Sequence, residues 1–149
     1  MNKTPHHVAI AILHKDGKFL LQLRDNIPNI AHPGFWAFFG GHIEEHETPD
    51  VAIKRELEEE IGYAPPVISL FDTFPTPSVI RHIYYGELTV DLDRLVLNEG
   101  WDMGLLTVED ILRGDRYSEK ANQIRPIANP HQGILLQFIE QYFPELYKA

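Results

Sequence analysis

The chain has 149 residues, and its 44% hydrophobic content is typical of one globular domain covering residues 1–149. The absence of cysteine excludes disulfide bonds and thiol chemistry. Because the sequence has no run of 18 apolar residues and no leader pattern, we expect a cytoplasmic protein without a membrane partner. The net charge of −9 argues against nucleic-acid polymers as partners but not against small phosphorylated molecules, because a bound metal ion inverts the local charge.

Two apolar strands come first in the chain, at residues 8–13 and 18–24. Asp16-Gly17 lies between them and is a strong signal for a tight hairpin turn. Residues 25–33 contain two prolines and are expected to form a loop that overhangs a site. Residues 36–39 form the next strand, which leads into Gly40-Gly41, a pair typical of backbone that comes close to another group.

A helix is predicted over residues 49–61. Thr48 is a suitable N-cap, Pro49 suits the first helical position, and Asp50 favours the positive end of the helix dipole. Gly62 is the residue expected to end the helix. The buried face is predicted by apolar residues four positions apart: Ile53, Leu57 and Ile61.

This helix and the segment before it are strongly acidic. Between residues 44 and 60, eight carboxylates stand against two cations, an excess that repels itself unless a cation or solvent relieves it. Glu56, Glu59 and Glu60 are spaced so that they share one helical face. Carboxylate oxygens are the ligands preferred by Mg²⁺ and Mn²⁺, so this face is a candidate metal site.

A Glu-rich helix is more often a solvated surface than a site. Three further features favour a site here: the Gly40-Gly41 loop, Glu47 just before the helix, and Arg55 beside Glu56. Arg55 is the cation placed to orient a carboxylate through a two-pronged contact.

The second half of the chain continues with strands at residues 67–74, 79–88 and 102–106. Thr107 begins a short helix, with Asp110 completing an acidic capping box, and the helix ends near Gly114. A last helix is predicted over residues 131–143, with an apolar core face: Ile134, Leu135, Phe138, Ile139 and Tyr142. Helices and strands that mix in this way predict an α/β fold arranged as an α/β/α sandwich.

The run from Gly41 to Tyr63 resembles the Nudix box, the signature of the Nudix hydrolase family. The family pattern is Gly-x5-Glu-x7-Arg-Glu-U-x-Glu-Glu-x-Gly-U, where U is a bulky aliphatic residue, and only Tyr63 departs from it. Its fixed positions are all matched here, by Gly41, Glu47, Arg55, Glu56, Leu57, Glu59, Glu60 and Gly62. A pattern with this many fixed positions is highly specific. The resemblance implies the Nudix-type α/β/α sandwich with a mixed β-sheet.

The resemblance also implies a pyrophosphohydrolase that uses Mg²⁺ or Mn²⁺ to cleave a nucleoside diphosphate linked to another moiety. By the same resemblance, Glu59 and Glu60 are metal ligands and Glu56 is either a ligand or the carboxylate that activates water. The Gly40 carbonyl is expected to be a further ligand. Gly41, Glu47 and Arg55 are expected to support the site, with Arg55 orienting a catalytic carboxylate.

The general base is not decided by the box. Several family members use a further Glu from a later loop as a ligand or base, and Glu99 is the candidate because Glu99-Gly100 precedes the strand at residues 102–106. A surface acid is an equal alternative for Glu99. His42 and His82 are weaker candidates, since a single His is more often a surface or packed side chain.

The substrate is the least determined property. Arg24 at the end of a strand, Arg81 and Trp101 are candidate contacts for a phosphate or a base, although most aromatic residues near the box are expected in the core. A nucleotide sugar is slightly preferred over the alternative, a damaged or non-standard nucleoside triphosphate. A non-catalytic nucleotide-binding module is disfavoured because the box carboxylates are intact. Homodimers are common in the family, and the sequence does not decide the oligomeric state.

Overall fold

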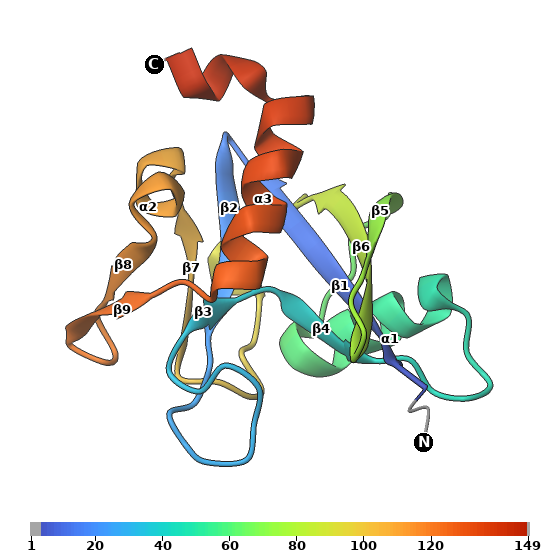
Figure 1. Ribbon diagram of the computed structural model, residues 1–149. Helices are drawn as coiled ribbons and strands as arrows, with labels where there is room; N and C mark the ends of the chain where they lie inside the picture. Colours follow the sequence, from blue (N-terminus) through green and yellow to red (C-terminus); the bar gives the residue numbers. More distant parts are fainter. Residues whose placement is uncertain (1–3, 149) are drawn as a thin grey trace. The chain divides into compact units, whose positions relative to one another are not determined.

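The computed structural model describes residues 4–148, and Figure 1 shows the helices and strands that they form. These residues fall into two compact units. The first unit comprises the chain up to Leu13 together with Phe39–Asn98, and the second comprises His14–Phe38 together with the chain from Glu99 onward. Two compact units can belong to one domain, and the prediction of a single domain over residues 1–149 stays a prediction.

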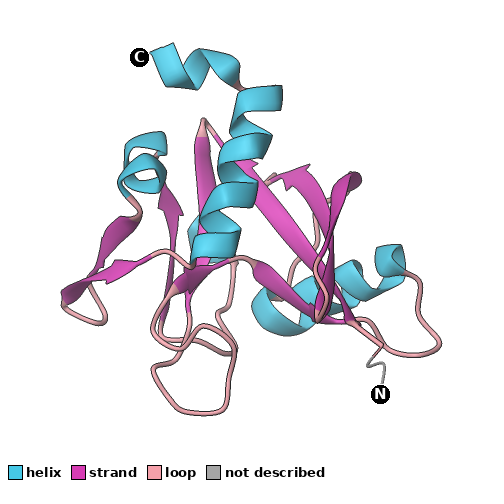
Figure 2. Cartoon of the chain, in the orientation of Figure 1, coloured by secondary structure: helices cyan, strands magenta, loops and turns pink. Residues whose placement is uncertain are grey.

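The first unit is built from antiparallel strand pairs and one long helix (Figure 2). Strand β1 lies beside β6, β6 pairs with β5, and β4 pairs with β1 so that Val8 is opposite His42 and Ala11 is opposite Phe39. Strand β1 continues into the second unit with His14 and Lys15. The elements are β1 (His6–Lys15), β4 (Phe39–His42), α1 (Pro49–Ile61), β5 (Ser69–Pro75), β6 (Val79–Glu87) and the 3₁₀ turn η1 (Leu92–Arg94).

Helix α1 has the bounds that the sequence predicts. The Thr48 hydroxyl accepts a hydrogen bond from the Val51 amide at 3.4 Å, which satisfies one of the free amides of the first turn. Gly62 ends the helix in the left-handed region at φ 68°, and its amide donates to the Glu58 carbonyl. The apolar face of the helix is fully buried and consists of Ala52, Ile53, Leu57 and Ile61. Its burial fixes the rotation of the helix about its axis and directs the acidic face outward.

The second unit is arranged around strand β2, which pairs antiparallel with both β3 and β7. Trp36 and Ile127 form an isolated parallel β-bridge, in contrast to the antiparallel pairs of β2. Strands β8 and β9 form a separate hairpin. The elements are β2 (Lys18–Leu23), β3 (Trp36–Ala37), β7 (Asp102–Leu106), α2 (Val108–Arg113), β8 (Asp115–Ser118), β9 (Gln123–Pro126), α3 (Asn129–Tyr142) and the 3₁₀ turn η2 (Pro144–Lys148).

Local signals in the second unit are confirmed where they depend on turn or capping chemistry. Asp16 and Gly17 have φ values of 52° and 75°, as a two-residue hairpin turn of type I′ requires. The Thr107–Asp110 capping box forms in both directions, and Gly114 ends α2 at φ 90°.

Several predicted details are wrong. The single strand at residues 36–39 is two short strands, with Phe38 between β3 and β4. The β8–β9 hairpin has no counterpart among the predicted elements. Tyr142 was assigned to the core of the last helix, but it is exposed because it lies in the last turn of α3, where the apolar face ends.

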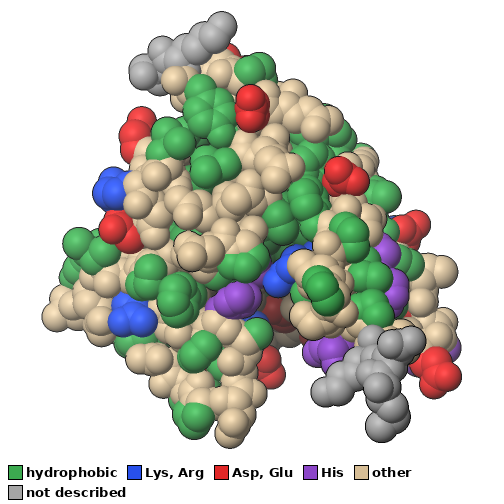
Figure 3. All heavy atoms as spheres, viewed as in Figure 1, with side chains coloured by type: hydrophobic (Ala, Val, Ile, Leu, Met, Phe, Trp, Pro, Cys, Tyr) green, Lys and Arg blue, Asp and Glu red, His purple; other side chains and the backbone are tan. Residues whose placement is uncertain are grey.

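Both units contain buried apolar side chains that hold their helices in place. In the second unit the ring of Phe138 on α3 meets the ring of Phe19 on β2 edge to face, with centroids 6.4 Å apart. Each such side chain removed from water contributes about 1.5–3 kcal/mol, so these contacts position α3 more strongly than helix propensity does. Figure 3 shows charged and histidine side chains scattered among apolar ones on the face in view, whereas Asp110 and His131 are buried. No helix among residues 4–148 is long and apolar enough to cross a membrane.

Candidate functional site

The Gly40-Gly41 pair on β4 brings backbone against the acidic face of α1 in the first unit. The Gly40 amide donates a hydrogen bond to Oε1 of Glu60 at 2.9 Å. A side chain at Gly41 could not be accommodated without movement, because its Cβ would lie 2.6 Å from Oε1 of Glu56. At Gly40 a Cβ would collide with the Ala9 carbonyl, and φ is 145°. Gly40 therefore cannot be replaced without displacing backbone, and Gly41 can carry a side chain only if the Glu56 carboxyl group moves.

Arg55 connects the carboxylates of this site. Its Nε and Nη2 donate to the two oxygens of Glu47 at 2.6 and 2.9 Å, a bidentate pair. Its Nη1 donates to Glu56 at 3.1 Å and to Glu59 at 3.2 Å. A further bond from Nη2 reaches the His42 carbonyl at 3.1 Å. One guanidinium thus fixes three carboxylates and the end of β4.

Glu47 and Arg55 form the fixed part of the site. The Glu47 side chain is only 4% exposed and also accepts a hydrogen bond from the Glu44 amide at 3.0 Å. The hydrogen bond from Arg55 and that from the Glu44 amide lower the pKa of Glu47 to about 2, and the same pairing with Glu47 raises the pKa of Arg55. Glu47 therefore stays ionised, and Arg55 is the single cation that it shares with Glu56 and Glu59 in this network.

Glu56 lies in an unfavourable position for a negative charge. Burial raises its pKa, the neighbouring Glu59 charge acts in the same direction, and Arg55 and a hydrogen bond with Glu60 oppose the shift. Its side chain is 15% exposed, against 59% for Glu59. A cation near this group would relieve both the burial cost and the repulsion from Glu59.

The donor set fits a hard divalent cation with retained water. Among residues 4–148, no group of three or more acidic or histidine side chains converges closely enough to cage a metal ion. Mg²⁺ does not need such a cage, because it usually binds through one or two carboxylates, several waters and substrate phosphates. Glu56 and Glu60 beside the Gly40 backbone, with the exposed Glu59, supply oxygen ligands of that kind.

The C-terminal end of α1 is held by contacts with Val96 and Asn98 that the sequence does not predict. The Asn98 amide donates to the Glu60 carbonyl at 3.0 Å, and its side chain donates to the Glu59 carbonyl at 2.7 Å. The Val96 amide likewise donates to the Ile61 carbonyl at 3.1 Å. These bonds satisfy carbonyls that a helix end leaves free, and they fix the two glutamates from the backbone side. The sequence feature that could have indicated this contact is Asn98, which directly precedes the candidate base Glu99.

The remaining candidate residues are distributed over both units. Arg81 lies on β6 in the first unit, opposite Phe74, and burial lowers its pKa. In the second unit, the Nε of Arg24 donates to the Ala31 carbonyl at 3.2 Å, so this side chain turns back onto the loop that follows it. The Trp101 amide donates to the Leu23 carbonyl at 2.8 Å, and Glu99 belongs to the same unit. The roles of these residues stay predictions.

The two histidines considered as bases are in different settings within the first unit. His42 contributes its backbone carbonyl to Arg55, and its ring meets that of His6 edge to face. His82 on β6 is hydrogen-bonded to His7. A role as a base for either ring stays a prediction.

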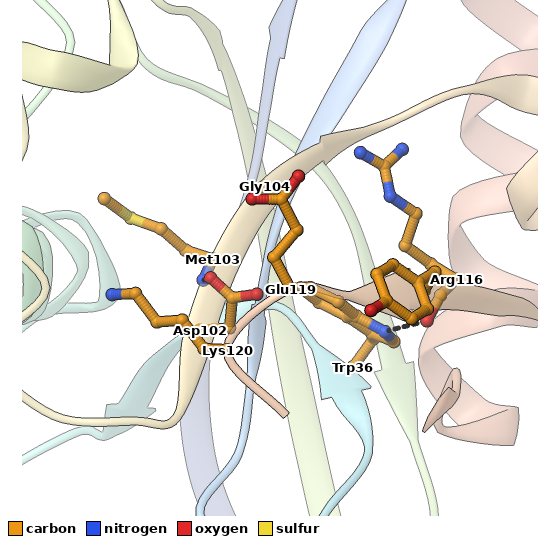
Figure 4. Close-up of a pocket in the computed structure, with 8 residues that line it drawn as sticks. Trp36, Asp102, Met103, Gly104, Arg116, Glu119 and Lys120 are labelled. Atoms are coloured by element: carbon orange, nitrogen blue, oxygen red, sulfur yellow. Dashed lines mark hydrogen bonds between the residues drawn. The ribbon is translucent and has the colours of Figure 1, made fainter. Parts of the chain in front are cut away.

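A pocket of about 420 Å³ lies in the second unit (Figure 4). Trp36 lines the pocket together with two acidic side chains, Asp102 and Glu119, and two positively charged ones, Arg116 and Lys120. No residue of the acidic run lines it, and neither Arg24 nor Trp101 does. The pocket and the acidic face of α1 therefore share no residue.

The model of the NUDIX domain family matches residues 3–126 of the chain. Over 85 residues the chain is 38% identical to an 8-oxo-dGTP diphosphatase of Proteus vulgaris, covering 56% of this chain and 73% of that protein. Over 74 residues it is 40% identical to an ADP-ribose pyrophosphatase of Methanocaldococcus jannaschii, covering 48% of this chain and 42% of that protein. This chain thus spans less than half of the second relative.

Solved structures show the same fold over nearly the whole chain. A MutT protein from Methanosarcina mazei superposes with a TM-score of 0.71 at 21% identity, covering 96% of this chain and 99% of that one. The NUDIX domain of Shewanella oneidensis NrtR, solved with ADP ribose, gives a TM-score of 0.70 at 22% identity and covers 93% of this chain and 89% of that one. These likenesses confirm the predicted α/β fold with a mixed sheet and helices around it.

Proposed function

Because this chain belongs to the Nudix hydrolase family, whose members act on phosphorus-containing anhydrides, we propose that it is a divalent-metal-dependent pyrophosphohydrolase that cleaves a nucleoside diphosphate linked to another moiety. The observation that carries the proposal is the arrangement on α1. Arg55 holds Glu47, Glu56 and Glu59 together, while the Gly40-Gly41 backbone meets Glu56 and Glu60. A solvated helix face needs neither the partly buried Glu47–Arg55 pair nor the glycines.

The residues that would hold Mg²⁺ or Mn²⁺ are Glu56, Glu59, Glu60 and the Gly40 carbonyl. When bound there, the ion would neutralise phosphate charge and make a water molecule more acidic. The protein's own part is orientation. Arg55 holds the carboxylates of Glu56 and Glu59. Asn98 holds the backbone carbonyls of Glu59 and Glu60. Little reorganisation of these groups is therefore needed when the substrate binds.

The proton of the attacking water needs an acceptor. Glu56 and Glu99 are the leading candidates, Glu56 within the Arg55 network and Glu99 directly after Asn98, and His42 and His82 are weaker ones. We keep both glutamates, since Glu56 serves either as a ligand or as the base. Arg24, Arg81 and Trp101 are proposed to contact the rest of the substrate.

Two substrate classes are supported by different relatives. A nucleoside diphosphate joined to a sugar is favoured by the Methanocaldococcus jannaschii ADP-ribose pyrophosphatase and by the NrtR domain solved with ADP ribose. A nucleoside triphosphate is favoured by the Proteus vulgaris 8-oxo-dGTP diphosphatase, whose own length is better covered. We place the diphosphate-linked class first and keep the triphosphate class as the second candidate.

The decisive experiment is a substrate panel with a matched pair of variants. Purified protein is incubated with nucleotide sugars, ADP-ribose, dinucleotides and normal or oxidised triphosphates, with Mg²⁺ or Mn²⁺, and the products are separated by chromatography. We expect Glu59→Gln to lose most of the activity and Glu58→Gln, on the same helix but exposed and without a role in the network, to keep it.

Either of two results would contradict the proposal. One is near-normal turnover by folded Glu59→Gln, which would remove the metal assignment. The other is inactivity of the wild-type protein on the whole panel together with ligand-induced thermal stabilisation, the behaviour of a nucleotide-binding module without catalysis.

A further inference from the structure

His7 and His82 form a close pair of imidazoles on neighbouring strands of the first unit. Nδ1 of His7 lies 2.9 Å from Nε2 of His82, and the two rings are inclined by only 23°. Strand β1 carries His7 and strand β6 carries His82, and β6 is paired on its other side with β5, where Thr73 faces His82. The backbone of a sheet therefore sets the spacing of the two rings.

This spacing is close to that of two imidazoles bound to one ion. Zn²⁺ binds imidazole nitrogen at about 2.0–2.1 Å, which places two nitrogens of a tetrahedral site roughly 3.3 Å apart. The observed separation is within a few tenths of an ångström of that value, and both rings must also rotate, because their facing nitrogens now point at each other along a hydrogen bond and not at a common ion. We propose that His7 and His82 form a second metal site, for a transition-metal ion that prefers nitrogen ligands, such as Cu²⁺ or Zn²⁺, with water completing its coordination.

This site differs in chemistry from the acidic face of α1. Imidazole suits Cu²⁺ and Zn²⁺, whereas carboxylate, carbonyl and water suit Mg²⁺ and Mn²⁺. The two sites share no residue. No third histidine or acidic side chain among residues 4–148 joins the pair as a metal ligand, so the protein supplies two ligands and the site is exchangeable, unlike a structural site with four.

Protonation also favours binding near neutral pH. A histidine must be neutral to bind a metal, and burial together with the neighbouring His7 lowers the pKa of His82 from its ordinary value. In the metal-free pair, one ring donates the proton of the hydrogen bond. That proton can move to the other nitrogen of the same ring, and His7 is exposed to solvent, so both facing nitrogens become available without a net loss of charge.

The test uses Cu²⁺ as the probe, with excess Mg²⁺ to occupy the acidic site. Wild-type protein is titrated by calorimetry, and the bound Cu²⁺ is examined by electron paramagnetic resonance for imidazole nitrogen coupling. We expect one bound Cu²⁺ with two coupled imidazoles. His82→Asn and His7→Asn should each weaken binding by at least about tenfold, since removing even a group that only orients a metal ligand has that effect. Each variant should retain one coupled imidazole.

His6→Asn is the matched control. His6 adjoins His7 on β1, but its ring contacts His42 and not His82, so binding and nitrogen coupling should stay as in the wild type. Circular dichroism establishes that each variant is folded. Equal affinity and equal coupling in the wild type and both pair variants would mean adventitious surface binding and would overturn the proposal, as would an equal loss of binding in His6→Asn.

Discussion

At the scale of single residues, the site depends on the shape of one guanidinium. Arg55 donates to Glu47, Glu56 and Glu59 and to the His42 carbonyl from nitrogens that lie in one plane. A lysine could supply the charge, but its single nitrogen cannot hold a bidentate partner and two further carboxylates at fixed positions. The exposed Glu59 therefore gains a defined position that its own packing does not provide.

Gly41→Ala tests how closely the site is fitted. The new Cβ would lie 2.6–2.8 Å from the atoms of the Glu56 carboxyl group, which is the far end of a flexible side chain and can rotate away. We expect the free energy of unfolding to change by less than about 1 kcal/mol, because a rotamer change costs that little. Turnover should fall roughly 10- to 100-fold, the usual effect of disturbing the support of a metal ligand, measured as kcat on the substrate found in the panel.

Gly104→Ala is the control for this variant. Gly104 lies on a strand, has no positive φ, and its added Cβ would meet no atom within 4 Å. Full activity is expected for Gly104→Ala, and an unchanged kcat in Gly41→Ala would show that the position of Glu56 is not important for turnover.

At the scale of elements, the sequence predicted the parts that carry their own local signals. Helix α1 is bounded by Thr48 and Gly62, and its acidic face follows from the burial of residues such as Leu57. The same holds for α2, whose capping box is formed by Thr107 and Asp110. Each of these signals links residues at most four positions apart, so no knowledge of the remaining chain is needed.

Other parts depend on contacts that a sequence does not display. In the β8–β9 hairpin, Tyr117 is opposite Ile124 and both are exposed, so the alternation of buried and polar residues that marks a strand is missing. Asn98 supports Glu59 and Glu60 only because the chain returns to the end of α1. The substrate contacts proposed for Arg24 and Trp101 depend on tertiary placement in the same way.

Helix α2 provides a pH-dependent contribution to stability through Asp110. Burial alone would raise its pKa, but hydrogen bonds from the Thr107 amide and from Arg116 and Arg113 outweigh burial and lower the pKa from 3.8 to about 2. A pKa lowered in the folded state stabilises the fold above pH 4, and this contribution is lost as the pH falls from about 4 to 2. The full contribution is about 2 kcal/mol.

Asp110→Asn should remove this contribution. At pH 7 urea unfolding should give a free energy lower by about 2 kcal/mol than in the wild type, and the difference should shrink between pH 4 and pH 3. Glu109→Gln changes an exposed acid on the same helix and should leave the wild-type pH dependence intact. A gap between Asp110→Asn and wild type that stays constant down to pH 3 would contradict the assignment.

At the scale of the whole molecule, the two compact units divide the chemistry. The Arg55 network and the glycines lie in the first unit, whereas the pocket beside Trp36 and the candidate contacts Arg24 and Trp101 lie in the second. The chain passes between the units at Leu13, Phe38 and Asn98, so neither is a continuous stretch of sequence. If these units form the predicted single domain, an ion bound in the first must stabilise the second.

Both tryptophans lie in the second unit, so their fluorescence reports on the unit that does not hold the acidic site. Mg²⁺ at about 100 times its dissociation constant stabilises a folded protein by about 2.7 kcal/mol, which for this size corresponds to a Tm increase of roughly 5–10 °C. We expect Mg²⁺ to raise the Tm measured by tryptophan fluorescence and the Tm measured by far-ultraviolet circular dichroism by the same amount. NaCl at equal ionic strength in place of Mg²⁺ should not raise either Tm, and Mg²⁺ should not raise them in the Glu56→Gln/Glu60→Gln variant. A tryptophan transition that stays fixed while the dichroism transition moves would show two independently folding domains, because binding energy reaches only the residues that unfold with the site.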